Sequence, residues 1–373
     1  MILNKLSLVN FKNYEQLTIE LSDRINCFVG NNGVGKTNLL DAIYYLSMCR
    51  SYFNNVDLYN IRHNAELFVI QGEYTVSGGY SEEILCSYKK NGRKVVKRNK
   101  KEYERLSEHI GLIPVVMITP NDSTLITEGS EERRRLIDTI ISQYNKSYLE
   151  QLIQYNRILQ QRNRLLKNTS GQVVTPFLEM FDVYDEQLAM AGRLIHTERK
   201  KFIAEFRAIF IEMYQQIAGN TEQVELHYQS QLQEADLLQL LRQNFAKDRQ
   251  LEYTSAGIHK DDLLLLIDGM PARRIASQGQ QKTFLVALKL AEYSLIHKHS
   301  QKKPLLLLDD LFDKFDYQRV QRLIELTQQN LSGQIFITDT ELARITPILK
   351  QVSNGHFVFR IESNEAVRLE YVL

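Results

Sequence analysis

Apolar and polar positions alternate along the first part of the chain. Residues 1–29 show this alternation on both sides of a polar bend at residues 10–14, and it recurs over residues 67–76 and 83–88. An apolar residue at every second position is typical of a β-strand with one buried face. The pattern therefore predicts a sheet-rich lobe built from the N-terminal part of the sequence.

Other short runs are apolar almost throughout. Residues 25–29, 305–308 and 334–339 have the length and continuity of strands buried on both faces of a parallel sheet. Residues 112–119 and 263–267 predict two further strands. A β-rich tail is expected after the last buried run and up to the end of the sequence.

From Ser130 the apolar period changes. Apolar residues recur every three or four positions up to about residue 245, with breaks at residues 168–171 and 219–220. The pattern predicts three or four helices that pack through one face each, and its interruptions argue against a long coiled coil. Ser130 is expected to cap the first of these helices, which has an acidic first turn.

Length and composition narrow the possible classes of protein. A chain of 373 residues exceeds one compact core, so two lobes, or one domain with an insertion, are expected. Three cysteines without a C-x-x-C motif argue against a disulfide framework and a structural zinc site. The cysteine usage fits the reducing cytoplasm. The apolar runs are too short to cross a bilayer, so a soluble protein without a membrane partner is expected. The net charge of +1 makes no global case for a nucleic-acid partner.

A candidate phosphate loop lies between the buried run 25–29 and a helix-like run. Its sequence is G-x-x-x-x-G-K-T, formed by Gly30, Asn31, Asn32, Gly33, Val34, Gly35, Lys36 and Thr37. The glycines allow backbone N–H groups to approach phosphate oxygens, and the following helix adds its positive end. Lys36 is expected to reach the β- and γ-phosphates and Thr37 to help hold Mg²⁺. The motif predicts a nucleoside triphosphate site.

Two adjacent carboxylates follow the apolar run 305–308. An apolar strand that ends in aspartate is the usual partner of a phosphate loop, so Asp309 is expected to hold Mg²⁺ through water. Asp310 is placed to orient or deprotonate an attacking water. Together with Lys36 and Thr37, the two aspartates favour nucleotide hydrolysis.

Two basic segments have more than one interpretation. Residues 89–101 place an Asn-Gly turn inside a basic run, which predicts a β-hairpin with a positive tip. Its Lys94, Lys97 and Arg98 either contact DNA phosphates or keep an edge strand soluble. Residues 133–135 are three arginines that form either a solvated face or a nucleotide or DNA contact.

One segment indicates which class of ATPase the chain belongs to. It consists of Ser277, Gln278, Gly279, Gln280 and Gln281. It resembles the signature motif of ABC-type ATPases, in which a serine and a glycine open a helix that binds the γ-phosphate. In that superfamily, the signature of one subunit completes the ATP site of another. The resemblance implies an ATP-dependent homodimer.

The match is more specific than the superfamily. Residues 10–14, 30–40, 129–135, 259–263 and 272–281, together with the double aspartate, resemble the RecF family of bacterial DNA replication and repair proteins, which is related to the Rad50 and SMC heads. The resemblance implies an α/β fold, namely an ABC-type P-loop ATPase head with a mixed-sheet lobe, a parallel RecA-like core and an inserted α-helical domain. The corresponding domains are residues 1–129, 130–250 and 251–373.

Some positions depart from the family pattern. Asp41 stands where Glu is more common, and Lys260 stands where Arg is usual. Residues 313–316, which end in the retained Asp316, differ from the usual Ser-Glu-Leu-Asp of the loop that contacts the partner subunit. Transporter ATPases carry a histidine where this chain has Thr338 and Asp339, so slow hydrolysis is expected.

The resemblance also implies a function. A RecF-like chain is expected to be a weak DNA-dependent ATPase whose ATP-bound dimer clamps gapped DNA or junctions of single- and double-stranded DNA. It is expected to act with RecO and RecR to load RecA. The alternatives are the ATPase subunit of a transporter, which would need a histidine switch, and a small-molecule P-loop kinase, in which the serine-led signature would have no role.

Overall fold

The computed structural model describes residues 1–76, 78–168, 175–219, 222–311, 324–325, 333–351, 355–362 and 364–369. The chain forms two compact units, one made of Met1–Asp122 and Lys282–Leu373 and the other of Ser123–Gln281. The second unit is therefore an insertion within the sequence of the first.

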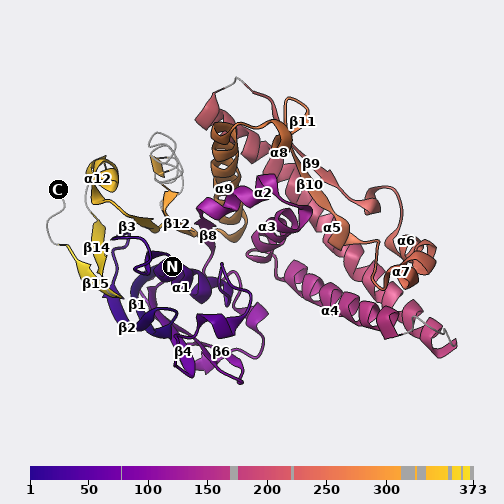
Figure 1. The fold of residues 1–373 in the computed structure, drawn as a ribbon, viewed down its shortest axis with the longest axis horizontal. Helices are drawn as coiled ribbons and strands as arrows, with labels where there is room; N and C mark the ends of the chain where they lie inside the picture. Colours follow the sequence, from indigo (N-terminus) through magenta and orange to yellow (C-terminus); the bar gives the residue numbers. More distant parts are fainter. Residues whose placement is uncertain are drawn as a thin grey trace. The chain divides into compact units, whose positions relative to one another are not determined.

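An antiparallel sheet forms the N-terminal part of the first unit (Figure 1). Its order is β2-β1-β4-β5-β6-β7, and its strands are β1 (Ile2–Phe11), β2 (Tyr14–Glu20), β4 (Leu67–Thr75), β5 (Ser81–Lys89), β6 (Lys94–Arg98) and β7 (Lys101–Glu102). Along β1 and β2, buried apolar residues are separated by more exposed, mostly polar positions, as the sequence predicts. The bend between them has positive φ at Asn10 and Lys12.

A second sheet carries the buried strands of this unit. Its order is β15-β14-β3-β13-β12-β8, and all neighbours are parallel except β14 and β15. The strands are β3 (Ile25–Val29), β8 (Val115–Ile118), β12 (Leu305–Leu308), β13 (Ile335–Asp339), β14 (His356–Glu362) and β15 (Glu365–Arg368). The four strands β3, β8, β12 and β13 are completely buried, which confirms the expectation for continuous apolar runs.

The first unit also contains several helices. They are α1 (Lys36–Met48), α12 (Leu342–Gln351) and the part of α9 (Gln278–Ser300) beyond residue 281, together with the 3₁₀ turns η1 (Asp57–Asn60), η2 (Leu106–Glu108) and η3 (Pro120–Ser123). The helix α12 was not expected, because residues after 339 were assigned to a β-rich tail. The predicted strand over residues 112–119 is shorter than expected, since Gly111 has a φ of 82° and a turn precedes β8.

The second unit is mainly helical, as its apolar period predicts. Its helices are α2 (Thr124–Thr127), α3 (Ser130–Ser142), α4 (Lys146–Asn168), α5 (Thr175–Ala218), α6 (Leu237–Gln243), α7 (Phe245–Leu251) and α8 (Ala272–Ile275), with the turns η4 (Gln231–Gln233) and η5 (Ile258–Lys260). The long helices α4 and α5 pack side by side (Figure 1). The expectation that Ser130 caps α3 is wrong, because Gly129 is the N-cap residue and no side chain caps the helix.

A small sheet interrupts this helical unit. Its strands are β9 (Val224–Gln229), β10 (Asp262–Ile267) and β11 (Met270–Pro271), in the order β11-β10-β9. The strand β9 lies inside the segment expected to be all helical, and alternating buried positions at Val224, Leu226 and Tyr228 were the missed signal. Because β9 pairs with β10, residues 251–281 belong to the compact inserted unit, whose bounds differ from the expected 130–250.

Buried arginines hold the inserted unit together. Arg162 is fully buried and binds Asp185 at 2.6 Å and Asp248 at 2.8 Å. Arg199 binds Asp261 at 2.8 Å and Asp138 at 2.8 Å. Each of these pairs joins α3, α4 or α5 to a segment more than twenty residues away, which explains why these parts form one unit.

The three arginines at residues 133–135 form contacts within the same inserted unit. Arg133 is 5% exposed, and its guanidinium binds both carboxylate oxygens of Asp262. Arg134 donates to the backbone oxygen of Asp261 at 2.7 Å. Only Arg135 is exposed, and it pairs with acidic residues in the first turn of α3. The first two arginines are therefore structural rather than a free basic face.

None of the described helices combines the length and the apolar character that a membrane span requires.

Candidate nucleotide-binding site

The candidate phosphate loop connects β3 to α1 and has the backbone that its glycines predict. Gly33 and Gly35 have φ values of 82° and 107°, which side chains rarely permit. A Cβ atom on Gly35 would lie 2.3 Å from Asn13 Nδ2. Because α1 begins at Lys36, the N–H groups of Lys36 and Thr37 have no carbonyl of their own helix to bind, whereas those of Asn38 and Leu39 bind the Gly35 carbonyl. The loop therefore presents donors suited to an anion.

The Lys36 ammonium is folded against this loop. It is 3% exposed and donates to the backbone oxygens of Gly30 at 2.9 Å and Asn31 at 3.0 Å. Its Nζ also lies 3.9 Å from Asp310 Oδ1. The ammonium is thus held between the start of the loop and the end of β12.

The structure brings Thr37 and Asp309 into contact. Thr37 Oγ1 donates to Asp309 Oδ1 at 2.8 Å, and the Asp309 side chain is almost completely buried. Burial raises the pKa of Asp309 to about 6, although hydrogen bonds from Thr338 and Thr37 oppose this shift. A buried carboxylate beside a hydroxyl is a hard oxygen donor set, and it fits the Mg²⁺ ion expected from the sequence.

Asp310 has an unusual backbone for a residue with a side chain. Its φ is 42°, in the left-handed region, and its N–H donates to Thr338 Oγ1 at 2.8 Å. Strained residues of this kind occur at functional sites, where the surrounding structure holds them. The Asp310 side chain is 26% exposed. It is therefore accessible to water while Asp309 is not.

Two residues that support the loop had no role in the sequence interpretation. Tyr14 donates its hydroxyl to the Gly35 backbone oxygen at 3.1 Å, and Asn13 Nδ2 donates to the Val34 backbone oxygen at 3.2 Å. Asn13 Oδ1 also accepts from Asn38 at 2.6 Å. The sequence predicts a bend at their segment, residues 10–14, and relates it to the family, but gives it no role at the loop. The bend between β1 and β2 thus braces the phosphate loop.

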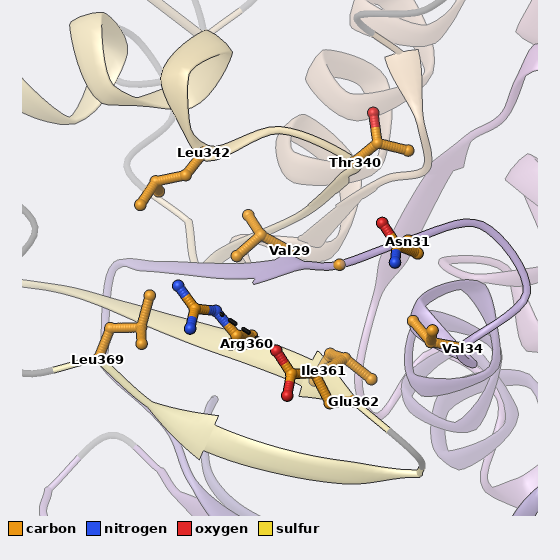
Figure 2. A pocket seen from close by; sticks show the side chains of 10 residues that line it. Val29, Asn31, Val34, Thr340, Leu342, Arg360, Ile361, Glu362 and Leu369 are labelled. Atoms are coloured by element: carbon orange, nitrogen blue, oxygen red, sulfur yellow. Dashed lines mark ion pairs between the residues drawn. The ribbon is translucent and has the colours of Figure 1, made fainter.

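A cavity of about 480 Å³ adjoins the first residues of the loop (Figure 2). Its lining comes from β3, β14 and the start of α12, and it contains the ion pair between Arg360 and Glu362 at 3.7 Å. Neither Lys36 nor the two aspartates line it. The cavity and the carboxylate cluster are therefore separate features of one sheet edge.

The signature segment opens α9, as the sequence predicts. Ser277 N donates to Gln280 Oε1 at 2.7 Å, and Gln280 N donates to Ser277 Oγ at 3.2 Å. This reciprocal pair is a capping box, which explains the spacing of serine and glutamine. Ser277 and Gln278 are exposed, whereas Gly279 and Gln280 are partly buried. A role of these four residues in a second subunit stays a prediction.

The basic hairpin forms, but most of its selected cations already have partners. Lys94 pairs with Asp57 at 2.9 Å and donates to the Cys49 backbone oxygen at 2.7 Å. Arg98 makes two hydrogen bonds to Glu82. Among the described residues, Lys97 has no ion pair, and it is the cation of the three best placed for another contact. The proposed dimer-loop residue, Asp316, lies outside the described residues.

Comparisons with known proteins agree with this geometry. The model of the RecF/RecN/SMC N-terminal domain matches residues 2–346. A DNA replication and repair protein RecF from Parabacteroides distasonis is 49% identical over 370 residues, which cover 99% of this chain and 100% of that protein. The RecF protein of Flavobacterium johnsoniae is 48% identical over 97% of this chain and 100% of that protein.

Solved structures of RecF proteins are also similar to this chain. The recombination mediator protein RecF with ATP, from the RecFOR pathway, has a TM-score of 0.88 and 29% identity over 99% of this chain and 97% of that one. An SMC head bound to a domain of ScpA, with a TM-score of 0.57 and 15% identity over 99% of this chain and 98% of that one, shares the fold. The expected ABC-type ATPase head, related to SMC heads, is therefore confirmed. The chain belongs to the RecF family of DNA replication and repair proteins.

Proposed function

We propose that this chain is an ATP-dependent DNA-binding recombination mediator. Its ATP-induced dimer clamps gapped DNA or junctions of single- and double-stranded DNA and helps RecA to load during recombinational repair and replication restart. The observation that carries the proposal is the contact between Thr37 and Asp309, which joins the phosphate loop to the acidic strand end. Family membership supports the DNA-repair role.

The residues of the site have distinct roles in this proposal. The loop N–H groups and Lys36 bind the phosphates of ATP, while Thr37 and Asp309 would hold Mg²⁺, which neutralises phosphate charge when bound. Asp310 orients a water and accepts its proton as the water oxygen attacks the γ-phosphorus. The bond to the β-phosphate oxygen breaks, leaving ADP and phosphate. The chain would thus be a weak DNA-dependent ATPase.

The signature segment supplies the proposed link between ATP and dimerisation. Ser277 and Gln278 are exposed at the start of α9, where a helix N-terminus favours an anion. In the proposed dimer, this segment of one copy binds the γ-phosphate held by the other copy. ATP is then part of the interface, and its hydrolysis releases the clamp. RecO and RecR are the expected protein partners, because solved relatives belong to the RecFOR pathway.

The transporter alternative is less well supported. It would need a histidine switch after the last core strand, but Thr338 and Asp339 end β13. The curated relatives quoted above are DNA replication and repair proteins. A role as a transporter ATPase therefore has no specific observation in its favour.

A gel-shift experiment tests the proposal. A duplex with a single-stranded gap is incubated with the protein and Mg²⁺ at low salt, with ATP, with ADP or without nucleotide. We expect retention of DNA with ATP and weaker retention in the other two samples. Equal retention of DNA in all three samples would contradict an ATP-dependent clamp. If no sample retains DNA at low salt, the proposed DNA binding is itself wrong.

A further inference from the structure

Thr338 has no assigned role, yet it touches both aspartates of the site. It is the fourth residue of β13 and is completely buried. The register of β12 and β13 pairs Leu308 with Ile337, so the next residues along the two strands are Asp309 and Thr338. The parallel pairing therefore brings the Thr338 side chain to the start of the double aspartate.

One hydroxyl group serves two purposes at this place. Thr338 Oγ1 lies 2.8 Å from Asp309 Oδ1 and 3.5 Å from Asp310 Oδ1. A hydroxyl has a single proton, so it donates to Asp309 at the shorter distance. Its oxygen accepts the Asp310 N–H at 2.8 Å. Thr338 thus fixes the side chain of one aspartate and the backbone of the next.

The backbone contact matters because Asp310 is strained. A φ of 42° is unfavourable for aspartate, and it persists only where neighbouring groups hold it. The Thr338 oxygen is the acceptor that holds this amide. In this conformation, Asp310 Oδ1 lies 3.9 Å from Lys36 Nζ, at the site where the reaction is proposed to occur.

Asp309 is held from two sides. On the side of the phosphate loop, Thr37 Oγ1 lies 2.8 Å from Asp309 Oδ1, to which it donates, and 3.1 Å from Oδ2, and Thr338 donates from the sheet. Thr37 belongs to the loop that binds the nucleotide, whereas Thr338 belongs to a buried strand. The sheet-side contact is thus the one that does not depend on the loop.

We propose that Thr338 is the positioning residue of this ATPase site, an inference that rests on the proposed function. Its hydroxyl sets the orientation of the metal-holding carboxylate Asp309 and the backbone conformation of Asp310. It is not a catalytic residue, because it acts through the two aspartates. ATP binding depends on the loop and Lys36, and should therefore depend little on Thr338.

The variant Thr338→Val removes the hydroxyl and keeps the shape, while Thr338→Ser keeps the hydroxyl. Supporting residues of a metal site affect metal affinity or activity by roughly 10–100-fold. We expect kcat for ATP hydrolysis to fall by about this factor in Thr338→Val, with KM for ATP nearly unchanged. Thr338→Ser should recover most of the turnover. Thr346→Val is a matched control, because Thr346 Oγ1 donates only to the Leu342 backbone oxygen at 2.9 Å in α12.

A second readout does not require turnover. The affinity for Mn²⁺ in the presence of ADP, measured by electron paramagnetic resonance, reports the orientation of Asp309. We expect weaker binding in Thr338→Val and nearly normal binding in Thr338→Ser and Thr346→Val. If thermal unfolding shows that Thr338→Val does not fold, Thr338→Ala is measured in the same two assays.

Two results would overturn the proposal. The first is wild-type Mn²⁺ affinity and turnover in the variants without a hydroxyl, and the second is a loss in Thr338→Ser as large as that in Thr338→Val, which would indicate a packing role. If the wild-type protein binds Mn²⁺ with ADP but never hydrolyses ATP, the proposed function fails. The Mn²⁺ comparison still decides the role of Thr338.

Discussion

Thr37 Oγ1 lies 2.8 Å from Asp309 Oδ1, although 272 positions of sequence separate the two residues. One belongs to the phosphate loop and first turn of α1, and the other follows the buried strand β12. Neither segment alone forms the site proposed for Mg²⁺ and ATP. Their contact brings together the N-terminal and C-terminal segments of the first unit at this proposed site.

The first prediction concerns the ammonium in this site. Lys36→Met removes the charge that faces the phosphates and should lower ATP affinity by at least tenfold, because charge-assisted contacts to phosphate are strong. The ATP-induced dimer should disappear with it. Light scattering with and without ATP measures this loss. An unchanged dimer in the variant would refute the role given to Lys36.

The second prediction separates ATP binding from hydrolysis. Asp310→Asn keeps the shape of the side chain but removes the proton acceptor, so turnover should fall by roughly 10²–10⁴-fold while ATP still binds. The dimer on DNA should then persist after ATP is added. Single-turnover experiments measure the rate of ATP hydrolysis, and DNA dissociation rates measure the persistence of the dimer on DNA. Wild-type turnover in Asp310→Asn would show that Asp310 is not a catalytic residue.

The third prediction concerns the basic hairpin. Lys97→Gln should weaken DNA binding and reduce the slope of log affinity against log salt by about 0.9 for one lost phosphate contact. Lys94→Gln and Arg98→Gln should change that slope less, since those cations already bind Asp57 and Glu82. Salt titrations of DNA binding distinguish the variants. A slope unaffected by all three changes would mean that the hairpin only protects a sheet edge.

The fourth prediction concerns the buried ion pairs of the inserted unit. Arg162→Met leaves Asp185 and Asp248 without their buried partner and should cost about 3–5 kcal/mol in the free energy of unfolding. Arg193→Met is the control, because its pair with Asp236 is exposed and should contribute less than about 1 kcal/mol. Denaturant unfolding compares the two. Equal losses would show that burial does not distinguish these pairs.

The fifth prediction concerns pH. Burial lowers the pKa of His259 to about 4, and the nearby charges of Lys260 and Arg134 also lower it, while Asp248 opposes them. The pKa of histidine in the unfolded chain is about 6.5, so between pH 4 and pH 6.5 the unfolded chain binds a proton at His259 more readily than the folded chain. The stability contributed by neutral His259 is complete above pH 6.5 and is lost as pH falls towards 4.

Thermal unfolding across this pH range measures the effect. The loss should be smaller in His259→Gln, which has no titrating ring in the site where Tyr155 and the Thr254 carbonyl bind the histidine. His109 and His196 also have lowered pKa values because of burial, so the comparison between variant and wild type is the informative one. Identical pH profiles would exclude His259 as a contributor.

The sequence predicts the parts of this molecule that depend on local patterns. Glycine and lysine spacing predicts the loop from Gly30 to Thr37, and the resemblance of residues 277–281 to an ABC signature motif predicts the start of α9. The strand β9 was missed because its alternation is short and lies among helical segments. The support from Asn13 and Thr338 was also missed. These two act through contacts with residues far away in sequence, and no local spacing indicates such contacts.

The position of β3 has a consequence for synthesis of the protein. Both strands that pair with it, β13 and β14, begin only at Ile335 and His356. While the ribosome makes the chain, the strand that leads into the phosphate loop has no neighbour on either edge until β13 and β14 have emerged. Nascent chains should therefore be unable to bind ATP, and the contiguous inserted unit can fold first. Nucleotide binding would begin only after β13 and β14 have been synthesised.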